Sequence, residues 1–290
     1  MRIIEPSELI LNPNGSIFHL HLKPEDVADK VILVGDPGRV DTVAKFFSKI
    51  ELTVSNREFK TTTGFFNGKR ISVVSTGIGT DNIDIVVNEL DALVNIDLEK
   101  RQVKEKHRQL TIVRLGTSGA LQADIPVDCF VSTNIAVGFD GLLNFYDGRN
   151  RVSDLAMEAA FLKHTNWKPL LAKPYFVHSN TELVELFKEI TVQGVTISAP
   201  GFYGPQGRVL RLPLADSDLN NSIESFRYND LKITNFEMES SAINGLSLLL
   251  GHSSITICAI IANRILKTAS ADYKSNIKKL IEQALQRLTK

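Results

Sequence analysis

Two arginines stand beside glycine turns, where backbone N–H groups are free to bind an anion. In "VILVGDPGRV" an apolar strand runs into Gly35, and Arg39 follows in the first turn of a helix. In "TIVRLGTSGAL" Arg114 interrupts an apolar strand shortly before Thr117. Turn amides, the positive end of a helix and a guanidinium together bind phosphate-like anions. Both stretches are therefore candidate anion sites.

Each of these arginines also has a purely structural interpretation. Arg39 would suit a tight strand-to-helix turn with a solvent-exposed side chain. Arg114, inside a buried strand, needs an anion or a carboxylate as partner, and a structural salt bridge would serve. Arg57, in "SNREFKTTTGFF", stands at the edge of a β-like segment and by itself indicates only a surface arginine.

Two carboxylates, Glu237 and Glu239, flank Met238 in "TNFEMESSAI", where a polar segment leads into an apolar helix. If the chain is extended there, both project to one side. They could act as general acid and base, bind vicinal hydroxyls, or simply favour the start of the helix through its dipole. A metal site is disfavoured because no histidine or aspartate stands at suitable spacing.

The turn "APGFYGPQGRV" (199–209) carries residue types that stack on and hydrogen-bond a flat ring, namely Phe202, Gln206 and Arg208. Alone, the turn is equally compatible with a surface loop. Beside an anion site and a hydroxyl site, it becomes the candidate for binding a heterocyclic base.

Repeated apolar segments that end near glycine must position these groups. The expected strands cover residues 31–35, 71–77, 111–116, 129–138, 194–201 and 255–263. Their continuous apolarity predicts strands covered on both faces, as in an α/β sheet. Helical spacing follows Gly79, where Asp81 or Asn82 would cap, and recurs from Met238 to Leu250 and from Ile277 to Leu288.

The 290 residues contain 33 basic and 33 acidic side chains, so no overall field favours nucleic acid or an anionic membrane. No convincing linker interrupts residues 1–290, which predicts a single domain. The N-terminus lacks a signal-peptide pattern and no apolar run could span a bilayer, so a cytoplasmic protein is expected. The charged run at 98–109 is expected to be a solvated helix end or loop.

Several familiar catalytic motifs are absent. "GIGTDN" lacks the third glycine of a dinucleotide loop, no glycine loop ends in GK[ST], and "GTSGA" is not a nucleophile elbow. Dehydrogenase, P-loop NTPase and serine hydrolase are therefore disfavoured.

Taken together, "GDPGRV", "REF", "STGIG", "RLGTSGAL", "FYGPQGR" and "FEMES" resemble, in order and rough spacing, the nucleoside phosphorylases of the uridine phosphorylase type. The resemblance runs from His19 to Arg264. It implies an α/β fold with a mixed, partly barrel-like central sheet flanked by helices. It also implies a homodimer or a hexamer of dimers, with active sites shared between subunits.

The resemblance assigns site residues in three groups. Phosphate would be bound by Gly35, Arg39, Arg114, Thr117 and, across the dimer interface, Arg57. Ribose would be bound by Glu237, Met238, Glu239 and His19, the last from the neighbouring subunit. The base would be bound by Phe202, Gln206 and Arg208.

The implied reaction is phosphorolysis of uridine or a related pyrimidine nucleoside, with phosphate as co-substrate. Glu239 would hold the ribose, while Arg208 and Gln206 stabilise the charge on the departing base. No metal or organic cofactor is implied, although some relatives hold a monovalent cation near the position of Glu58. Purine-cleaving relatives carry an aspartate acid where this chain has Asn263, which favours a pyrimidine.

Three alternatives stay open at this point. A nucleosidase of the same fold would use water on a purine thioether nucleoside. Another phosphorylase of the fold would cleave a purine nucleoside or methylthioadenosine. A non-catalytic nucleoside-binding protein would keep the pocket without the reaction. The sequence does not decide between uridine, deoxyuridine and thymidine.

Overall fold

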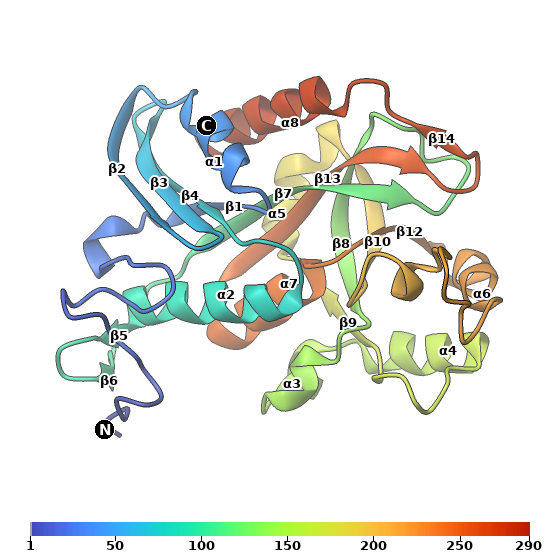
Figure 1. The fold of residues 1–290 in the computed structure, drawn as a ribbon, viewed down its shortest axis with the longest axis horizontal. Coiled ribbons are helices and arrows are strands. Elements are labelled where there is room, and N and C mark those ends of the chain that lie inside the picture. Colours follow the sequence, from blue (N-terminus) through green and yellow to red (C-terminus); the bar gives the residue numbers. More distant parts are fainter. Residues whose placement is uncertain (1) are drawn as a thin grey trace.

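The computed structural model describes residues 2–290 (Figure 1). Its helices are α1 (Pro37–Ala44), α2 (Thr80–Asn95), α3 (Arg149–Val152), α4 (Leu155–Thr165), α5 (Thr181–Phe187), α6 (Leu219–Ser225), α7 (Ser240–Leu250) and α8 (Tyr273–Leu288). Its strands are β1 (Lys30–Val34), β2 (Lys49–Asn56), β3 (Phe59–Phe66), β4 (Lys69–Ser75), β5 (Ile96–Asp97), β6 (Gln102–Val103), β7 (Thr111–Ala120), β8 (Phe130–Gly138), β9 (Tyr175–His178), β10 (Val192–Ser198), β11 (Arg227–Tyr228), β12 (Leu231–Glu237), β13 (Ser253–Asn263) and β14 (Thr268–Ala269).

The central sheet is mixed and partly closed into a barrel. Strands β12, β10, β8, β13 and β7 are neighbours in that order, and β7 pairs again with β12. The closing pairs are Asn235 with Ala120 and Phe236 with Gly119, in antiparallel register. From β7 the sheet continues as an open wing through β1, β4, β3 and β2. This arrangement confirms the predicted α/β class with a mixed, partly barrel-like sheet.

Helices cover both faces of the sheet, which explains the continuous apolarity of the strands. In β1, Val31 and Leu33 pack into a core with α2 and α7. The alternate residues Ile32 and Val34 pack into a second core with α1, α5 and α8. Figure 1 shows α8 on one side of the sheet and α2 with α7 on the other. Neither face of β1 is left to solvent.

The six expected strands are confirmed as β1, β4, β7, β8, β10 and β13, with ends shifted by a few residues. Two helix starts differ from expectation. Gly79, at φ +98°, is the N-cap of α2, so Asp81 and Asn82 lie inside its first turn. Helix α7 begins at Ser240, leaving Met238 in the preceding connection, and it ends at Gly251 in the left-handed conformation as expected.

The charged run at 98–109 is not simply solvated. It contains the turn and the second strand of a short hairpin of β5 and β6. The Arg101 side chain donates to the carbonyl oxygens of Ile4, Glu5 and Leu9, and Arg108 donates to that of Val27. These arginines therefore hold parts of the chain between Ile4 and Val27, which precede the first strand of the sheet.

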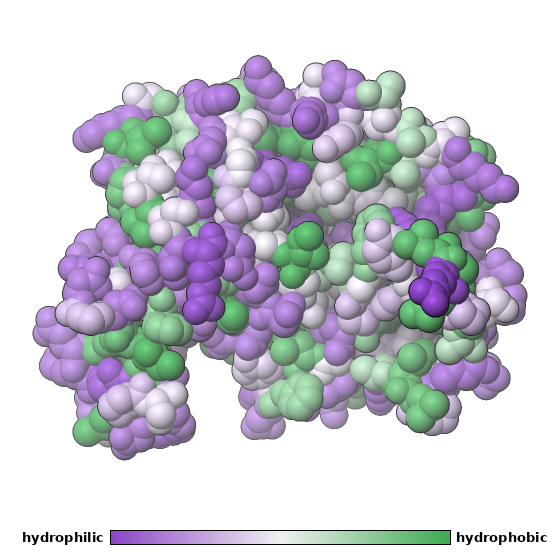
Figure 2. Space-filling model, in the orientation of Figure 1, coloured by the Kyte–Doolittle hydropathy of each residue, from purple (hydrophilic) through white to green (hydrophobic). Residues whose placement is uncertain are grey.

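On the face shown in Figure 2, apolar side chains form small separate groups among polar ones. Within residues 2–290, every helix is too short or too polar to cross a lipid bilayer.

Candidate active site

A cavity of 650 Å³ lies where several strands end. Its walls come from the segments after β1, β4 and β10, the ends of β12 and β13, and β7. In parallel arrangements the carboxyl ends of strands meet at one edge, which is where α/β proteins place their sites. The predicted site residues that line it are Gly35, Arg39, Arg114, Thr117, Phe202, Gln206, Arg208, Glu237, Met238 and Glu239.

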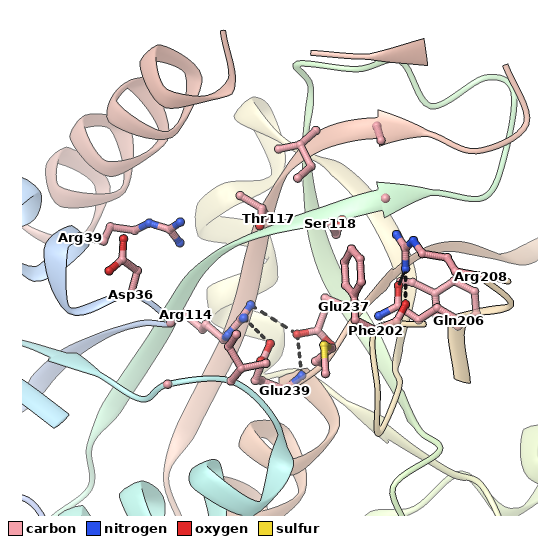
Figure 3. Close-up of a pocket in the computed structure, with 18 of the residues that line it drawn as sticks. Asp36, Arg39, Arg114, Thr117, Ser118, Phe202, Gln206, Arg208, Glu237 and Glu239 are labelled. Atoms are coloured by element: carbon pink, nitrogen blue, oxygen red, sulfur yellow. Dashed lines mark hydrogen bonds and ion pairs between the residues drawn. The ribbon is translucent and has the colours of Figure 1, made fainter. Parts of the chain in front are cut away.

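Arg114 lies at the centre of this cavity, with its side chain 6% exposed (Figure 3). Its Nη2 donates to Glu239 Oε2, and its Nη1 lies 3.3 Å from Glu237 Oε2. Burial alone would lower the pKa of Arg114, but the charges of Glu239 and Glu237 raise it above its usual value, so the guanidinium stays charged. The two predicted carboxylates therefore converge on one buried cation.

Gly116 makes room for this arginine. A Cβ at Gly116 would collide with Arg114 Nη1 as it lies here, so glycine leaves space for the guanidinium to fold back along β7. Arg114 Nε is buried and has no hydrogen-bond partner among residues 2–290. An unmet donor on a buried cation is costly unless a ligand accepts from it.

Arg39 provides a second cation at the far end of the cavity. It lies in the first turn of α1, where Asp36 caps the helix by accepting from the Gly38 N–H. Arg39 Nη1 donates to Leu115 O at 3.2 Å. Burial lowers the pKa of Arg39, and the charge of Arg114 lowers it further, because two cations face the same space. This end of the cavity suits an anion.

Glu239 has a backbone partner besides Arg114. Gly79, which needs a positive φ to turn the chain into α2, donates its N–H to Glu239 Oε1 at 2.9 Å. Burial raises the pKa of Glu239; Arg114 opposes this rise and Glu237 adds to it. Burial thus disfavours the charged form of Glu239, and Arg114 is the cation that opposes this effect.

The turn after β10 supplies the other end of the cavity. Arg208 Nη1 donates to Gln206 Oε1 and to Phe202 O, each at 2.6 Å. Because arginine has no acceptor, this bond fixes which end of the Gln206 amide is oxygen. Gln206 Nε2 and the second lone pair of Oε1 are left to pair with the edge of a planar ring.

Phe202 lines the cavity, and its contact with a base stays a prediction. Its ring is half exposed, and the Arg208 guanidinium covers one face with Cζ 3.8 Å from the ring centre. Phe236, at the end of β12, also lines the cavity. The sequence did not single out Phe236 as a cavity residue, because a phenylalanine in a strand is equally typical of the hydrophobic core.

Two predicted residues lie outside the cavity of this chain. Arg57 is exposed, at φ +54° in the turn between β2 and β3. His19 Nδ1 pairs with Glu89 Oε1 at 2.6 Å, away from Arg114. The structure of a single chain thus brings together every predicted site residue except the two expected from a neighbouring subunit.

Sequence reasoning missed several supporting residues. Arg264 Nη1 donates to Gln206 O and so fastens the turn. Ser198 and Ser240 donate to Glu237. Ile261 and Ala262 of β13 complete the wall. The sequence alone does not indicate these roles, because they depend on which strand ends lie side by side in the fold.

Comparisons with known proteins agree with this geometry. A family model described as "Phosphorylase superfamily" matches residues 29–290. Uridine phosphorylase of Thermococcus kodakarensis is 29% identical over 256 residues, covering 87% of this chain and 79% of the relative. Uridine phosphorylase of Escherichia coli is 30% identical over 262 residues, covering 86% and 87%.

Among solved structures, a Trypanosoma brucei nucleoside phosphorylase, described as showing uridine phosphorylase activity, superposes with a TM-score of 0.89 at 28% identity. The match covers 97% of this chain and 99% of the other. The fold, the family match and the extent of these likenesses lead to one conclusion: this chain belongs to the phosphorylase superfamily.

Proposed function

We propose that the protein is a pentosyltransferase that converts uridine and phosphate to uracil and ribose 1-phosphate. The observation that carries this proposal is the order of three groups along one cavity. Figure 3 shows Arg39 at one end, Arg114 with its two carboxylates in the middle, and Gln206 with Arg208 at the other end. The similarity to uridine phosphorylases supports the choice of substrates.

Phosphate takes its place between Arg39 and Arg114, close to Gly35 and Thr117. Each guanidinium attracts a unit negative charge 4 Å away by about 4 kcal/mol at an effective dielectric of about 20, before desolvation is subtracted. This attraction fixes the attacking oxygen relative to C1′ of the ribose, which is where much of the rate gain arises.

Arg114 must change partners as phosphate arrives. In the structure it bonds Glu239, so an incoming phosphate competes with that carboxylate. Glu239 then accepts hydrogen bonds from ribose hydroxyls, with Met238 packed beside the sugar. Phosphate and nucleoside therefore assist each other's binding. When the ion pair of Arg114 and Glu239 separates, phosphate binds Arg114 and the ribose binds Glu239.

The base leaves as an anion stabilised by the Gln206 and Arg208 donors. Uracil carries two carbonyl oxygens and an N–H, which match the Gln206 amide and the free nitrogens of Arg208. Negative charge grows on these oxygens only as the glycosidic bond breaks, so the interaction strengthens in the transition state. The reaction needs no organic cofactor and no resident metal; a monovalent cation near Glu58 stays a prediction.

Asn263 supports the preference for a pyrimidine. Its Nδ2 donates to Gln122 O at 2.9 Å and to Ile125 O at 2.8 Å. Its Oδ1 accepts from the N–H groups of Ile265 and Leu266. The side chain is thus fully used in fastening the end of β13, and supplies no acid to a leaving purine.

The charges of the cavity support a shared site. Three arginines and three carboxylates line it: Arg39, Arg114, Arg208, Asp36, Glu237 and Glu239. One chain therefore offers a phosphate dianion no excess positive charge. We infer that Arg57, exposed on its turn, supplies that charge to a second copy, in a homodimer or a hexamer of dimers in which His19 reaches the ribose.

We also propose that residues 1–290 form a single domain, because one continuous sheet joins strands from both halves of the chain.

The first test is release of free base from a panel of nucleosides with and without phosphate. We expect uracil from uridine only when phosphate is present, and no base from inosine, adenosine or methylthioadenosine. Chromatography of the products measures this. Phosphate-independent release would identify a nucleosidase instead, and binding without release would identify a nucleoside-binding protein.

Replacing Arg208 tests its role toward the leaving base. Arg208→Ala is expected to lower kcat/KM for uridine by roughly 10²-fold or more, because it removes charge stabilisation of the transition state. Phosphate affinity should hardly change. Exposed Arg211, three positions away, provides the matched control Arg211→Ala. An Arg208→Ala enzyme with parental turnover would exclude the role.

Asn263→Asp tests whether one substitution can supply the acid that protonates a leaving purine. The new carboxylate oxygen would face the carbonyls of Gln122 and Ile125, so the free energy of unfolding should fall by about 1–3 kcal/mol. Hypoxanthine release from inosine should stay absent. Denaturant titration and product analysis check both, with exposed Asn229→Asp as control. Gain of purine cleavage would contradict the structural role.

Mixing two impaired variants at low phosphate concentration tests the shared site. Arg57→Ala should raise the KM for phosphate, and Arg114→Ala should abolish phosphorolysis. In a mixed dimer one site would carry neither substitution, so co-refolding the two should restore part of the uridine activity. No recovery, with mixed dimers demonstrated by native mass spectrometry, would rule out the donation of Arg57.

A further inference from the structure

The two carboxylates of the site have different surroundings. Glu237 Oε1 accepts from Ser198 Oγ at 2.5 Å, Ser240 Oγ at 2.7 Å and Ser240 N at 3.0 Å. Glu237 Oε2 accepts from Glu239 N at 2.9 Å and Ser240 N at 3.0 Å, and lies 3.3 Å from Arg114 Nη1. Both oxygens of Glu237 are thus surrounded by donors from its own chain.

Glu239, in contrast, keeps unused acceptor positions. Its Oε1 accepts from Gly79 N and its Oε2 from Arg114. An ionised carboxylate has about four lone-pair positions in all. Those of Glu237 are occupied, whereas Glu239 has room for sugar hydroxyls.

Ser198 lies within hydrogen-bond distance of Glu237 and of two neighbours in α7. Its Oγ donates to Glu237 Oε1, accepts from Ser241 N at 2.9 Å and lies 2.9 Å from Ser240 Oγ. Ser241 Oγ in turn donates to Asp140 Oδ2 at 2.9 Å, and Tyr175 OH donates to Asp140 Oδ1 at 2.8 Å. This buried chain of hydrogen bonds extends from Glu237 into the region between β8, β9 and α7.

We propose that Glu237 is the fixed anchor of Arg114 rather than a sugar ligand, and that Ser198 is a positioning residue that holds this anchor. The inference rests on the proposed function and divides the two carboxylates that the family resemblance assigns jointly to ribose. Glu237 keeps Arg114 in place when Glu239 releases it. Without Ser198, Glu237 can turn, and Arg114 is no longer aimed at phosphate.

Four variants test this division: Ser198→Ala, Glu237→Gln, their combination, and Glu239→Gln. Phosphate affinity is measured by calorimetry without nucleoside. Sugar recognition is measured as the ratio of kcat/KM for uridine to that for 2′-deoxyuridine and for 3′-deoxyuridine. Ser254→Ala serves as control, because Ser254 is equally buried but bonds Asn244, away from Glu237.

Ser198→Ala should weaken phosphate binding about tenfold, as expected for loss of a hydrogen bond to a charged group, and should leave both sugar ratios within about twofold of the parent. The combined variant should bind phosphate no worse than Glu237→Gln, because Ser198 acts through Glu237. Glu239→Gln alone should reduce the sugar ratios. Ser254→Ala should match the parent.

The proposal is wrong if Glu237→Gln reduces the sugar ratios as much as Glu239→Gln, or if the losses of Ser198→Ala and Glu237→Gln add. Thermal unfolding confirms that each variant is folded; should Ser198→Ala not fold, Ser240→Ala removes a second hydroxyl from the same oxygen and must weaken phosphate binding likewise. Failure of the parent to release uracil with phosphate would refute the proposed function instead.

Discussion

A charged guanidinium buried inside a sheet is the constraint on which this structure depends. Arg114 needs anionic partners in the interior, since an isolated buried charge would cost many kcal/mol. Glu237 is the last residue of β12, and Glu239 follows in the connection to α7. That connection reaches Arg114 because the antiparallel pairs of Asn235 and Phe236 with β7 close the barrel. The charge of Arg114 is therefore neutralised only when the sheet closes.

Much of the fold could be predicted from local patterns. Continuous apolar runs marked the strands because helices cover both faces, and three-and-four spacing marked α2, α7 and α8. The barrel itself came only from the family resemblance, because side-chain periodicity does not say which strands pair. The start of α2 was misplaced because Gly79 caps it through backbone geometry and its bond to Glu239, not through a polar side chain.

The candidate site could likewise be predicted only in part. Residues in motifs of unusual composition, such as Arg114 in an apolar strand and Gln206 in a glycine turn, could be singled out from the sequence. Ser198 could not, because a serine at a strand end is common and its role depends on Glu237, 39 positions away. Arg57 and His19 lie outside the cavity of one chain, so their assignment rests on the resemblance and on the balance of charges.

The resting contacts of the cavity explain how a site of balanced charge can still bind an anion. Arg114 is aligned by Glu239, and Arg208 by Gln206 and the Phe202 carbonyl. Each guanidinium is already removed from much of the water and pointed into the cavity. A substrate that binds there exchanges one acceptor for another, so little of the desolvation cost falls on binding. Internal partners thus preorganise the cations. We propose that a substrate displaces Glu239 from Arg114, because Glu239 has fewer donors around it than Glu237.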